Sequence, residues 1–266
     1  MSKLIDVRLD PAEGIDHATA AIAAGECIVL PTDTVYGIGA DALSATAVQG
    51  LLNAKQRGRD LPPPVLIAEP AILRSLAAEV TDHTAALAHA FWPGALTLVV
   101  AAPANLRMDL GDRGDTIAVR IPDHEFTREL LRATGPLAVS SANTHGNPAA
   151  TTAAEALQQL GEAVAVYLEA GDGSGPVPST IVDVTCDPPR VLREGRITRE
   201  QLIEVVGVLA EDAPPAEPED EPTAAGDADE ALESSSVEPG ENPDVPSVTA
   251  ASAAAAEIVE PPRADA

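Results

Sequence analysis

Residues 117–141 read IAVRIPDHEFTRELLRATGPLAVSS, and this stretch decides the fold class. It opens on an apolar run at 117–121 and closes on a second at 137–140, and each run predicts a buried strand. Between them, Asp123 is well placed to cap a helix that runs to about Ala133, because an aspartate side chain can accept from the free backbone N–H groups of a first turn. Strand, helix and strand in quick succession predict an α/β fold.

The same alternation extends in both directions from this stretch. Further strands are predicted at 27–30, 65–68, 96–100, 164–168, 180–184 and 191–193, and further helices at 44–55, 70–78, 81–91, 152–160 and from Thr198 onward. The runs at 96–100 and 117–121 follow each other closely enough to be antiparallel neighbours. We therefore expect a twisted mixed sheet with flanking helices in a single domain.

The composition changes abruptly near Ala210. From Glu211 onward the chain holds 16 of the 42 acidic residues and 9 of the 24 prolines but one basic residue, which is a net charge of −15. Such a segment cannot bury enough apolar surface to offset the loss of chain entropy on folding. The sequence therefore predicts a catalytic domain at 1–208 and a disordered acidic tail, rich in proline and alanine, at 209–266.

The charge and the aromatic content of the first 210 residues argue against a nucleic-acid-binding surface. Their 26 acidic and 15 basic residues leave a net charge of about −11, whereas binding to a phosphate backbone requires a broad basic surface. The chain has only five aromatic residues, which makes base stacking a poor expectation.

The compartment follows from what the sequence lacks. It has no apolar run of signal-peptide length at its start and no stretch near 18 uninterrupted apolar residues. Cys27 and Cys186 lie far apart and belong to no metal-binding motif, as is typical of free thiols in a reducing compartment. We expect a soluble, cytoplasmic protein without a membrane partner.

Polar residues follow the first apolar strand directly. The run Pro31-Thr32-Asp33-Thr34 brings two hydroxyls and a carboxylate to a strand end, where open α/β sheets bind ligands. These side chains are candidates for a binding site. The alternative is an ordinary turn in which Thr32 and Asp33 act as caps.

Three cations in five residues, Lys55-Gln56-Arg57-Gly58-Arg59, follow the predicted helix at 44–55. A guanidinium offers a planar fork to paired oxygens and an ammonium a mobile charge, so the group could clamp a phosphate or a carboxylate. The alternative is that these cations interact with the dipole at the helix C-terminus.

Other strand ends carry the same residue types. Ser141 and Asn143 follow the strand at 137–140, Thr116 and Arg120 flank the strand at 117–119, and Arg193 ends the last strand. An ordinary turn would explain each group singly, but their recurrence favours one anion-binding site. The chain has no GxxxxGK[ST], GxSxG or HExxH motif and no Cys/His cluster, so a Walker loop, a nucleophile elbow and a protein-bound metal site are not expected.

An ordered set of motifs over about residues 5–205 resembles the YrdC-like (TsaC-type) family of threonylcarbamoyl-AMP synthases. The motifs are PTDTVYGIGAD at 31–41, Lys55-x-Arg57, FWPGALTL at 91–98, AVRIP at 118–122, Ser141-Ala-Asn143, STIVD at 179–183 and VLREGRI at 191–197. The resemblance implies a twisted α/β sheet around a deep basic cavity. It also implies the reaction of L-threonine, bicarbonate and ATP to threonylcarbamoyl-AMP and pyrophosphate, the first step toward the t6A base at position 37 of tRNA.

The resemblance also implies roles for individual residues. Threonine would be bound by Thr34, Arg120 and Ser179, with Thr32 expected to line the same cavity. ATP would be held by Arg57, Thr116, Ser141 and Arg193, while Lys55 and Asn143 complete a catalytic clamp with Arg57 and Ser141. Mg²⁺ would arrive on the phosphates of ATP rather than in a protein cage.

Two other functions compete with this interpretation. One is an RNA-binding or ribosome maturation module, which would contact double-stranded RNA or tRNA; the negative charge of the folded part opposes it. The other is a carbamoyl-transfer module of hydrogenase maturation, which would bring zinc-finger and acylphosphatase-like segments that this chain lacks. For the synthase, the implied downstream partner is the complex that transfers threonylcarbamoyl to tRNA.

Overall fold

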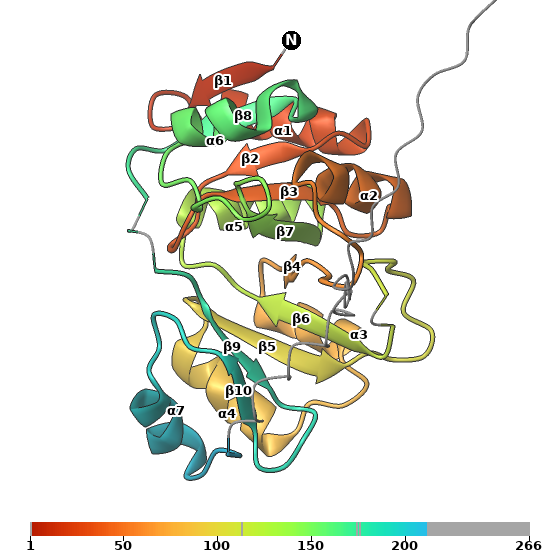
Figure 1. The fold of residues 1–266 in the computed structure, drawn as a ribbon, viewed down its shortest axis with the longest axis vertical. Helices are drawn as coiled ribbons and strands as arrows, with labels where there is room; N and C mark the ends of the chain where they lie inside the picture. Colours follow the sequence, from red (N-terminus) through yellow and green to blue (C-terminus); the bar gives the residue numbers. More distant parts are fainter. Residues whose placement is uncertain (1, 113, 174, 176, 212–266) are drawn as a thin grey trace, which may run out of the picture. The chain divides into compact units, whose positions relative to one another are not determined.

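The computed structural model describes residues 2–112, 114–173, 175 and 177–211 (Figure 1). Its strands are β1 (Lys3–Asp6), β2 (Ile28–Leu30), β3 (Gly37–Asp41), β4 (Val65–Leu66), β5 (Leu96–Ala101), β6 (Thr116–Arg120), β7 (Leu137–Ser141), β8 (Val166–Glu169), β9 (Thr180–Asp183) and β10 (Arg190–Arg193). Its α-helices are α1 (Pro11–Ala23), α2 (Ala45–Ala54), α3 (Leu73–Leu76), α4 (Asp82–Phe91), α5 (Glu125–Thr134), α6 (Ala153–Leu160) and α7 (Arg199–Val206), and short 3-10 turns lie at Pro70–Ile72 and Gly161–Ala163.

The described strands form one mixed sheet in the order β1-β8-β2-β3-β7-β4-β6-β5-β9-β10. Figure 1 shows this sheet running from β1 at the top to β10 at the bottom. β5 and β6 are antiparallel neighbours, which confirms that prediction. β4 lies between β6 and β7, parallel to the first and antiparallel to the second, so the strands on either side of α5 do not pair with each other. The predicted twisted α/β sheet with flanking helices is confirmed.

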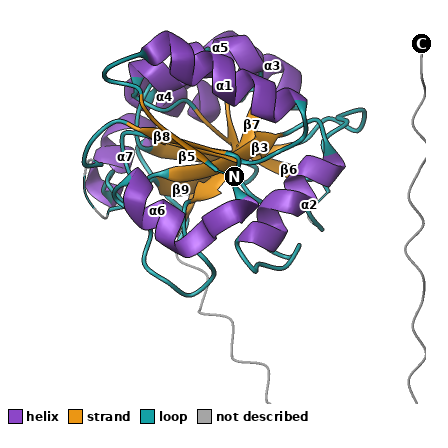
Figure 2. Ribbon diagram, turned by 90° about the horizontal axis from the view of Figure 1, so that it is seen from above, coloured by secondary structure: helices purple, strands orange, loops and turns teal. Residues whose placement is uncertain are grey.

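Helices cover both faces of the sheet. Figure 2 shows α1, α3 and α5 on one side of the strands and α2 and α6 on the other. The buried apolar residues form two clusters. One packs α1 and α5 against β1, β2 and β8, and the other contains Leu51 of α2, Leu87 of α4 and Leu202 of α7.

Side-chain caps fix several helix starts at the predicted positions. The hydroxyls of Ser44, Thr81, Thr152 and Thr198 each accept from a backbone N–H three residues further on. At α5 the predicted cap is wrong, because His124 is the N-cap residue and no side chain caps the helix. Asp123 lies one residue earlier, and its carboxylate accepts instead from Arg128 Nη1 at 3.0 Å.

Some elements differ from the prediction. The helix predicted at 70–78 is a 3-10 turn followed by the single turn of α3. β1, α1 and β3 were not predicted. α1 has a recognisable start, since Asp10 accepts from the backbone N–H of Glu13 and Pro11 opens the helix. β3 is the glycine-rich sequence GIGAD, whose type is decided by its pairing with β2 and β7 rather than by its own propensity.

The predicted acidic tail at 209–266 lies outside the described residues from position 212 onward. In the described part of the chain, none of the helices has the length and apolar character needed to cross a membrane.

Candidate active site

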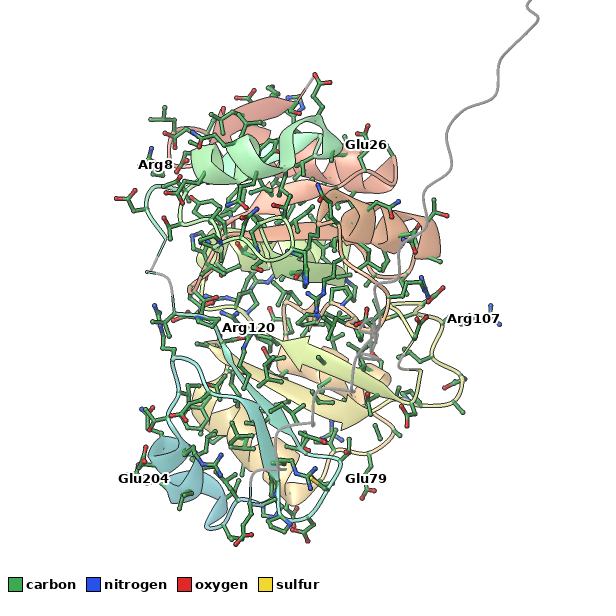
Figure 3. The ribbon with its side chains drawn as sticks, viewed as in Figure 1. Arg8, Glu26, Glu79, Arg107, Arg120 and Glu204 are labelled. Carbon is green, nitrogen blue, oxygen red and sulfur yellow. The ribbon has the colours of Figure 1, made fainter. Side chains whose placement is uncertain are left out.

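A cavity of about 540 Å³ lies over the central strands of the sheet. Its lining includes Thr97 and Val99 of β5, Thr116, Ala118 and Arg120 of β6, Val139 and Ser141 of β7, and Ile181 of β9. Thr116, Ala118 and Arg120 alternate along β6, and alternation places such residues on one face of a sheet. The sequence predicts a site at strand ends, but the cavity extends along the face of the sheet. In Figure 3, Arg120 lies in the middle of the ribbon, whereas Glu26, Glu79 and Glu204 lie at its periphery.

The cavity brings together nine of the ten residues predicted for the site. These are Thr32, Thr34, Arg57, Thr116, Arg120, Ser141, Asn143, Ser179 and Arg193. They come from separate stretches of the chain, between residues 32 and 193, that border the part of the sheet from β3 to β10. Their common location supports one binding site, while the role of each residue stays a prediction.

Arginine supplies the positive charge of this cavity. Burial lowers the pKa of Arg57, against the raising effect of the Asp60 carboxylate. Partial burial, and then the positive charges of Arg120 and Arg57, lower the pKa of Arg193. A pKa shift of this kind means that the charged forms are disfavoured where they stand. The arrangement therefore favours the binding of an anion, which would relieve both the repulsion and the loss of solvation.

Arg57 and Arg193 keep bonding capacity beyond their contacts with the protein. Arg57 Nη1 donates to Ser140 Oγ at 3.2 Å, and its buried Nε has no partner among the described residues. Arg193 donates to the backbone oxygen of Ser179 at 2.8 Å and to Ser179 Oγ at 3.2 Å. A buried N–H without an acceptor is rare in proteins, so the Nε of Arg57 points to a ligand that supplies one.

Hydroxyl groups form a second kind of lining. Thr34 Oγ1 accepts from Arg120 Nη1 at 3.1 Å and lies 3.0 Å from Thr32 Oγ1, which donates to the backbone oxygen of Val35. On the opposite side, Thr97 Oγ1 lies 3.0 Å from Ser179 Oγ. These groups can exchange protons and hydrogen bonds with a polar ligand at short range.

Lys55 is the predicted site residue that does not line the cavity. It is the C-cap residue of α2 and is 2% exposed. Its ammonium donates to the backbone oxygens of Ser141 at 2.5 Å and Asn143 at 2.7 Å, and to Asn143 Oδ1 at 3.2 Å. Because an ammonium has three protons, these contacts use all of its donors.

Asn143 is engaged in the same way. Its amide nitrogen donates to the backbone oxygens of Thr144 at 3.0 Å and Asn147 at 2.7 Å, and its carbonyl accepts from Lys55. The backbone N–H of His145 in turn donates to the backbone oxygen of Lys55 at 2.7 Å. The structure thus places Lys55 behind the loop at 141–147, where it fixes the backbone that presents Ser141.

No role is predicted for Thr97 from the sequence, and Asp33 is only one of the candidates in the run 31–34. Thr97 is the second residue of β5, is 1% exposed and lines the cavity; a lone hydroxyl inside an apolar run was the available signal. Asp33 lies within the predicted motif and contacts Arg120. Among the described residues, no group of three His, Cys, Asp or Glu side chains could hold a metal ion.

Comparisons with known proteins agree with the fold and the motifs. The Sua5/YciO/YrdC family model, described as telomere recombination, matches residues 20–195. A protein of Mycobacterium tuberculosis is 50% identical over 199 residues, which cover 75% of this chain and 92% of the relative. The threonylcarbamoyl-AMP synthase of Bacillus subtilis is 34% identical over 214 residues, which cover 80% of this chain and 62% of the relative.

A solved structure extends the comparison to three dimensions. The crystal structure of P. abyssi Sua5 complexed with L-threonine superposes with a TM-score of 0.73 at 34% identity, over 78% of this chain and 61% of that chain. Family model, relatives and structure all match the part of the chain that builds the cavity. This protein belongs to the Sua5/YciO/YrdC family.

Proposed function

We propose that this protein is an L-threonylcarbamoyladenylate synthase, which makes threonylcarbamoyl-AMP and pyrophosphate from L-threonine, bicarbonate and ATP. The observation that carries the proposal is the convergence of Arg57, Arg120 and Arg193 with threonine and serine hydroxyls in one cavity. The names of the relatives and the threonine complex of P. abyssi Sua5 support the same substrate class.

The chemistry of this reaction suits a cationic cavity. Threonine's amine and bicarbonate form a carbamate with loss of water. A carbamate oxygen then attacks the α-phosphorus of ATP, and the bond from that phosphorus to the bridging oxygen breaks as pyrophosphate leaves. Carbamate, carboxylate and triphosphate are all anionic, so the main tasks of the protein are to position them and to compensate their charge.

We propose one group of cavity residues for threonine and another for the nucleotide. Thr32, Thr34, Arg120 and Ser179 would bind threonine, and Arg57, Thr116, Ser141 and Arg193 would hold the nucleotide. Asn143, and Lys55 from behind the loop, would keep Ser141 in place.

Mg²⁺ would enter with ATP. Asp60 is the one carboxylate that the described residues contribute to the cavity wall, which fits an ion held mainly by phosphate oxygens and water. When bound, such an ion offsets charge on the phosphates. We further propose that the protein works in the cytoplasm and that its product passes to the complex that modifies tRNA.

Pyrophosphate release from ATP by the purified full-length protein tests the proposal. With threonine and bicarbonate present, we expect release together with a product of the mass of threonylcarbamoyl-AMP. Omission of either substrate should reduce release to background.

Arg120→Met and Arg74→Met form a matched pair for this assay. Arg120 lines the cavity, whereas Arg74 is exposed on α3. Arg120→Met should abolish threonine-dependent release and Arg74→Met should leave it unchanged. If the rate of pyrophosphate release were unchanged when both threonine and bicarbonate are omitted, the result would contradict the proposed function.

A further inference from the structure

Asp33 and Arg120 form a nearly enclosed ion pair at the edge of the cavity. Arg120 Nη2 lies 2.6 Å from Asp33 Oδ1, and the two side chains are 8% and 11% exposed. Burial disfavours the charged form of Arg120, and the Asp33 carboxylate offsets part of that effect. A pair of this kind holds a fixed geometry, because separating its members would leave a buried charge without compensation.

The hydrogen bonds of Arg120 fix the orientation of its guanidinium. Nε donates to the backbone oxygen of Gly94 at 2.9 Å, Nη1 to Thr34 Oγ1 at 3.1 Å and Nη2 to Asp33 Oδ1 at 2.6 Å. A guanidinium has five N–H groups, so each Nη keeps one N–H beyond these contacts with described residues. Arg120 lines the cavity, and these two donors are available to a planar carboxylate there.

Asp33 itself is not among the described residues that line the cavity. Its Oδ1 also accepts from the backbone N–H of Asp123 at 3.0 Å, which ties the loop after β2 to the segment between β6 and α5. Its backbone oxygen accepts from Arg196 Nη1 at 2.7 Å. Asp33 is therefore joined to two other segments of the chain, residues 120–123 and Arg196, and contacts Arg120 without lining the cavity.

We propose that Asp33 is a positioning residue that locks Arg120 in the orientation that receives the carboxylate of the amino-acid substrate. The inference rests on the proposed function, since the amino acid it concerns is the substrate of that reaction. It excludes the other role open to a carboxylate at this site, that of a general base which removes a proton from the substrate amine. A base must reach the proton that it takes, and Asp33 does not border the cavity.

Steady-state kinetics of Asp33→Asn separate the two roles. The variant keeps the shape and the acceptor oxygen but removes the negative charge that orients Arg120. We expect the KM for threonine to rise roughly 10- to 100-fold, while kcat and the KM for ATP stay within about twofold and the pH profile of kcat keeps its shape. A general base would instead lower kcat by about 10²–10⁴-fold and remove one limb of that profile, and this result would overturn the inference.

Asp123→Asn is the matched control. Asp123 is the same residue type, contacts Asp33 through its backbone and has a side chain that is 65% exposed. The substitution should leave the KM for threonine unchanged. An equal rise of that KM in both variants would show a general effect of charge and would contradict a specific role for Asp33.

A second measurement needs no turnover. The melting temperatures of Asp33→Asn, Arg120→Met and the double variant should be non-additive. Arg120→Met alone leaves a buried carboxylate unpaired, so adding Asp33→Asn should restore part of the lost stability. Additive changes would overturn the coupling. If the wild type showed no threonine-dependent turnover, the proposed function would fail, while this cycle would still report whether Asp33 fixes Arg120.

Discussion

Arg57 lines the cavity and makes few hydrogen bonds with the rest of the described chain. Its buried Nε lacks a partner among the described residues, and its contact with Ser140 is long at 3.2 Å. Arg57→Met removes this charge without breaking a strong contact. We expect the KM for ATP to rise about 10- to 100-fold, because the variant loses hydrogen bonds from a charged group to the nucleotide. The melting temperature should stay the same or rise.

Thermal denaturation and ATP-dependent pyrophosphate release on one preparation check this expectation. Arg74→Met, an exposed change of the same type, should alter neither quantity. A clear fall in the melting temperature of Arg57→Met with an unchanged KM for ATP would assign Arg57 to the structure of the loop rather than to the nucleotide.

Lys55 should behave in the opposite way. Lys55→Met leaves the oxygens of Ser141 and Asn143 without the donor that holds them. Each buried acceptor left unpaired costs about 1–3 kcal/mol, so the melting temperature should fall along with turnover. An unchanged melting temperature would contradict the positioning role that the contacts of Lys55 give it.

The titration of Lys55 provides a second test. Burial, and then the charge of Arg57, lower the pKa of Lys55 from 10.5 to about 8. Between these two values the unfolded chain binds more protons at this site than the folded chain. The free energy of unfolding of the wild type, relative to Lys55→Met, should therefore rise as the pH increases from about 8 to about 10.5. Denaturant titrations of both proteins across this range measure the difference, and a difference that is flat or falls would contradict it.

At the scale of elements, β3 shows why a glycine-rich strand is required. A Cβ on Gly37 would lie 2.5 Å from Val139 Cγ1 of the neighbouring strand β7. Gly37→Ala should destabilise the protein by about 1–3 kcal/mol through overpacking, as measured by chemical denaturation. Trimming the opposing side chain with Val139→Ala should recover part of this loss.

Gly50→Ala is the control for that substitution. Gly50 lies in α2, and an added Cβ would meet nothing closer than Cys27 Sγ at 3.9 Å. Alanine there should stabilise the helix by roughly 0.5–1 kcal/mol. A similar loss of stability in both variants would argue against the packing of β3 as the cause.

The elements predicted from sequence are those whose signals are local. Apolar runs located β2, β5, β6, β7 and β9, and hydroxyl caps located α2, α4, α6 and α7. β3 has a sequence of low strand propensity, and the space available between Leu30 and Val139 decides its conformation. β1 pairs with β8, more than 150 residues away, and no local pattern encodes that pairing.

The residues of the site also differ in whether a local sequence signal identifies them. Cationic and hydroxyl side chains at strand ends could be recognised from composition and motif, and most of them share the cavity. Which of them face a ligand depends on packing. Lys55 and Arg57 are two residues apart, yet Lys55 lies behind the 141–147 loop and Arg57 lines the cavity.

At the scale of the whole molecule, charge is divided unevenly along the chain. Residues from 211 onward carry more than half of the net charge of −26. Of the residues that the structure describes, those that line the cavity all precede position 194. We therefore expect a chain that ends at residue 211 to keep its melting temperature and its turnover, measured against the full-length protein at the same ionic strength. Loss of either quantity on truncation would show that the acidic segment contributes to the catalytic domain.

The order of strands in the sheet also bears on how a newly made chain becomes active. β9 packs beside β5, with Thr180 opposite Leu96, and β10 follows as the outermost strand. Ser179 and Arg193 therefore reach the cavity from the last strands to leave the ribosome. A nascent chain that has already formed β2 to β7 lacks the lining that Ser179 and Arg193 provide, so the cavity is completed late in synthesis. Pairings across such long stretches also make folding slow compared with a helical protein of the same size.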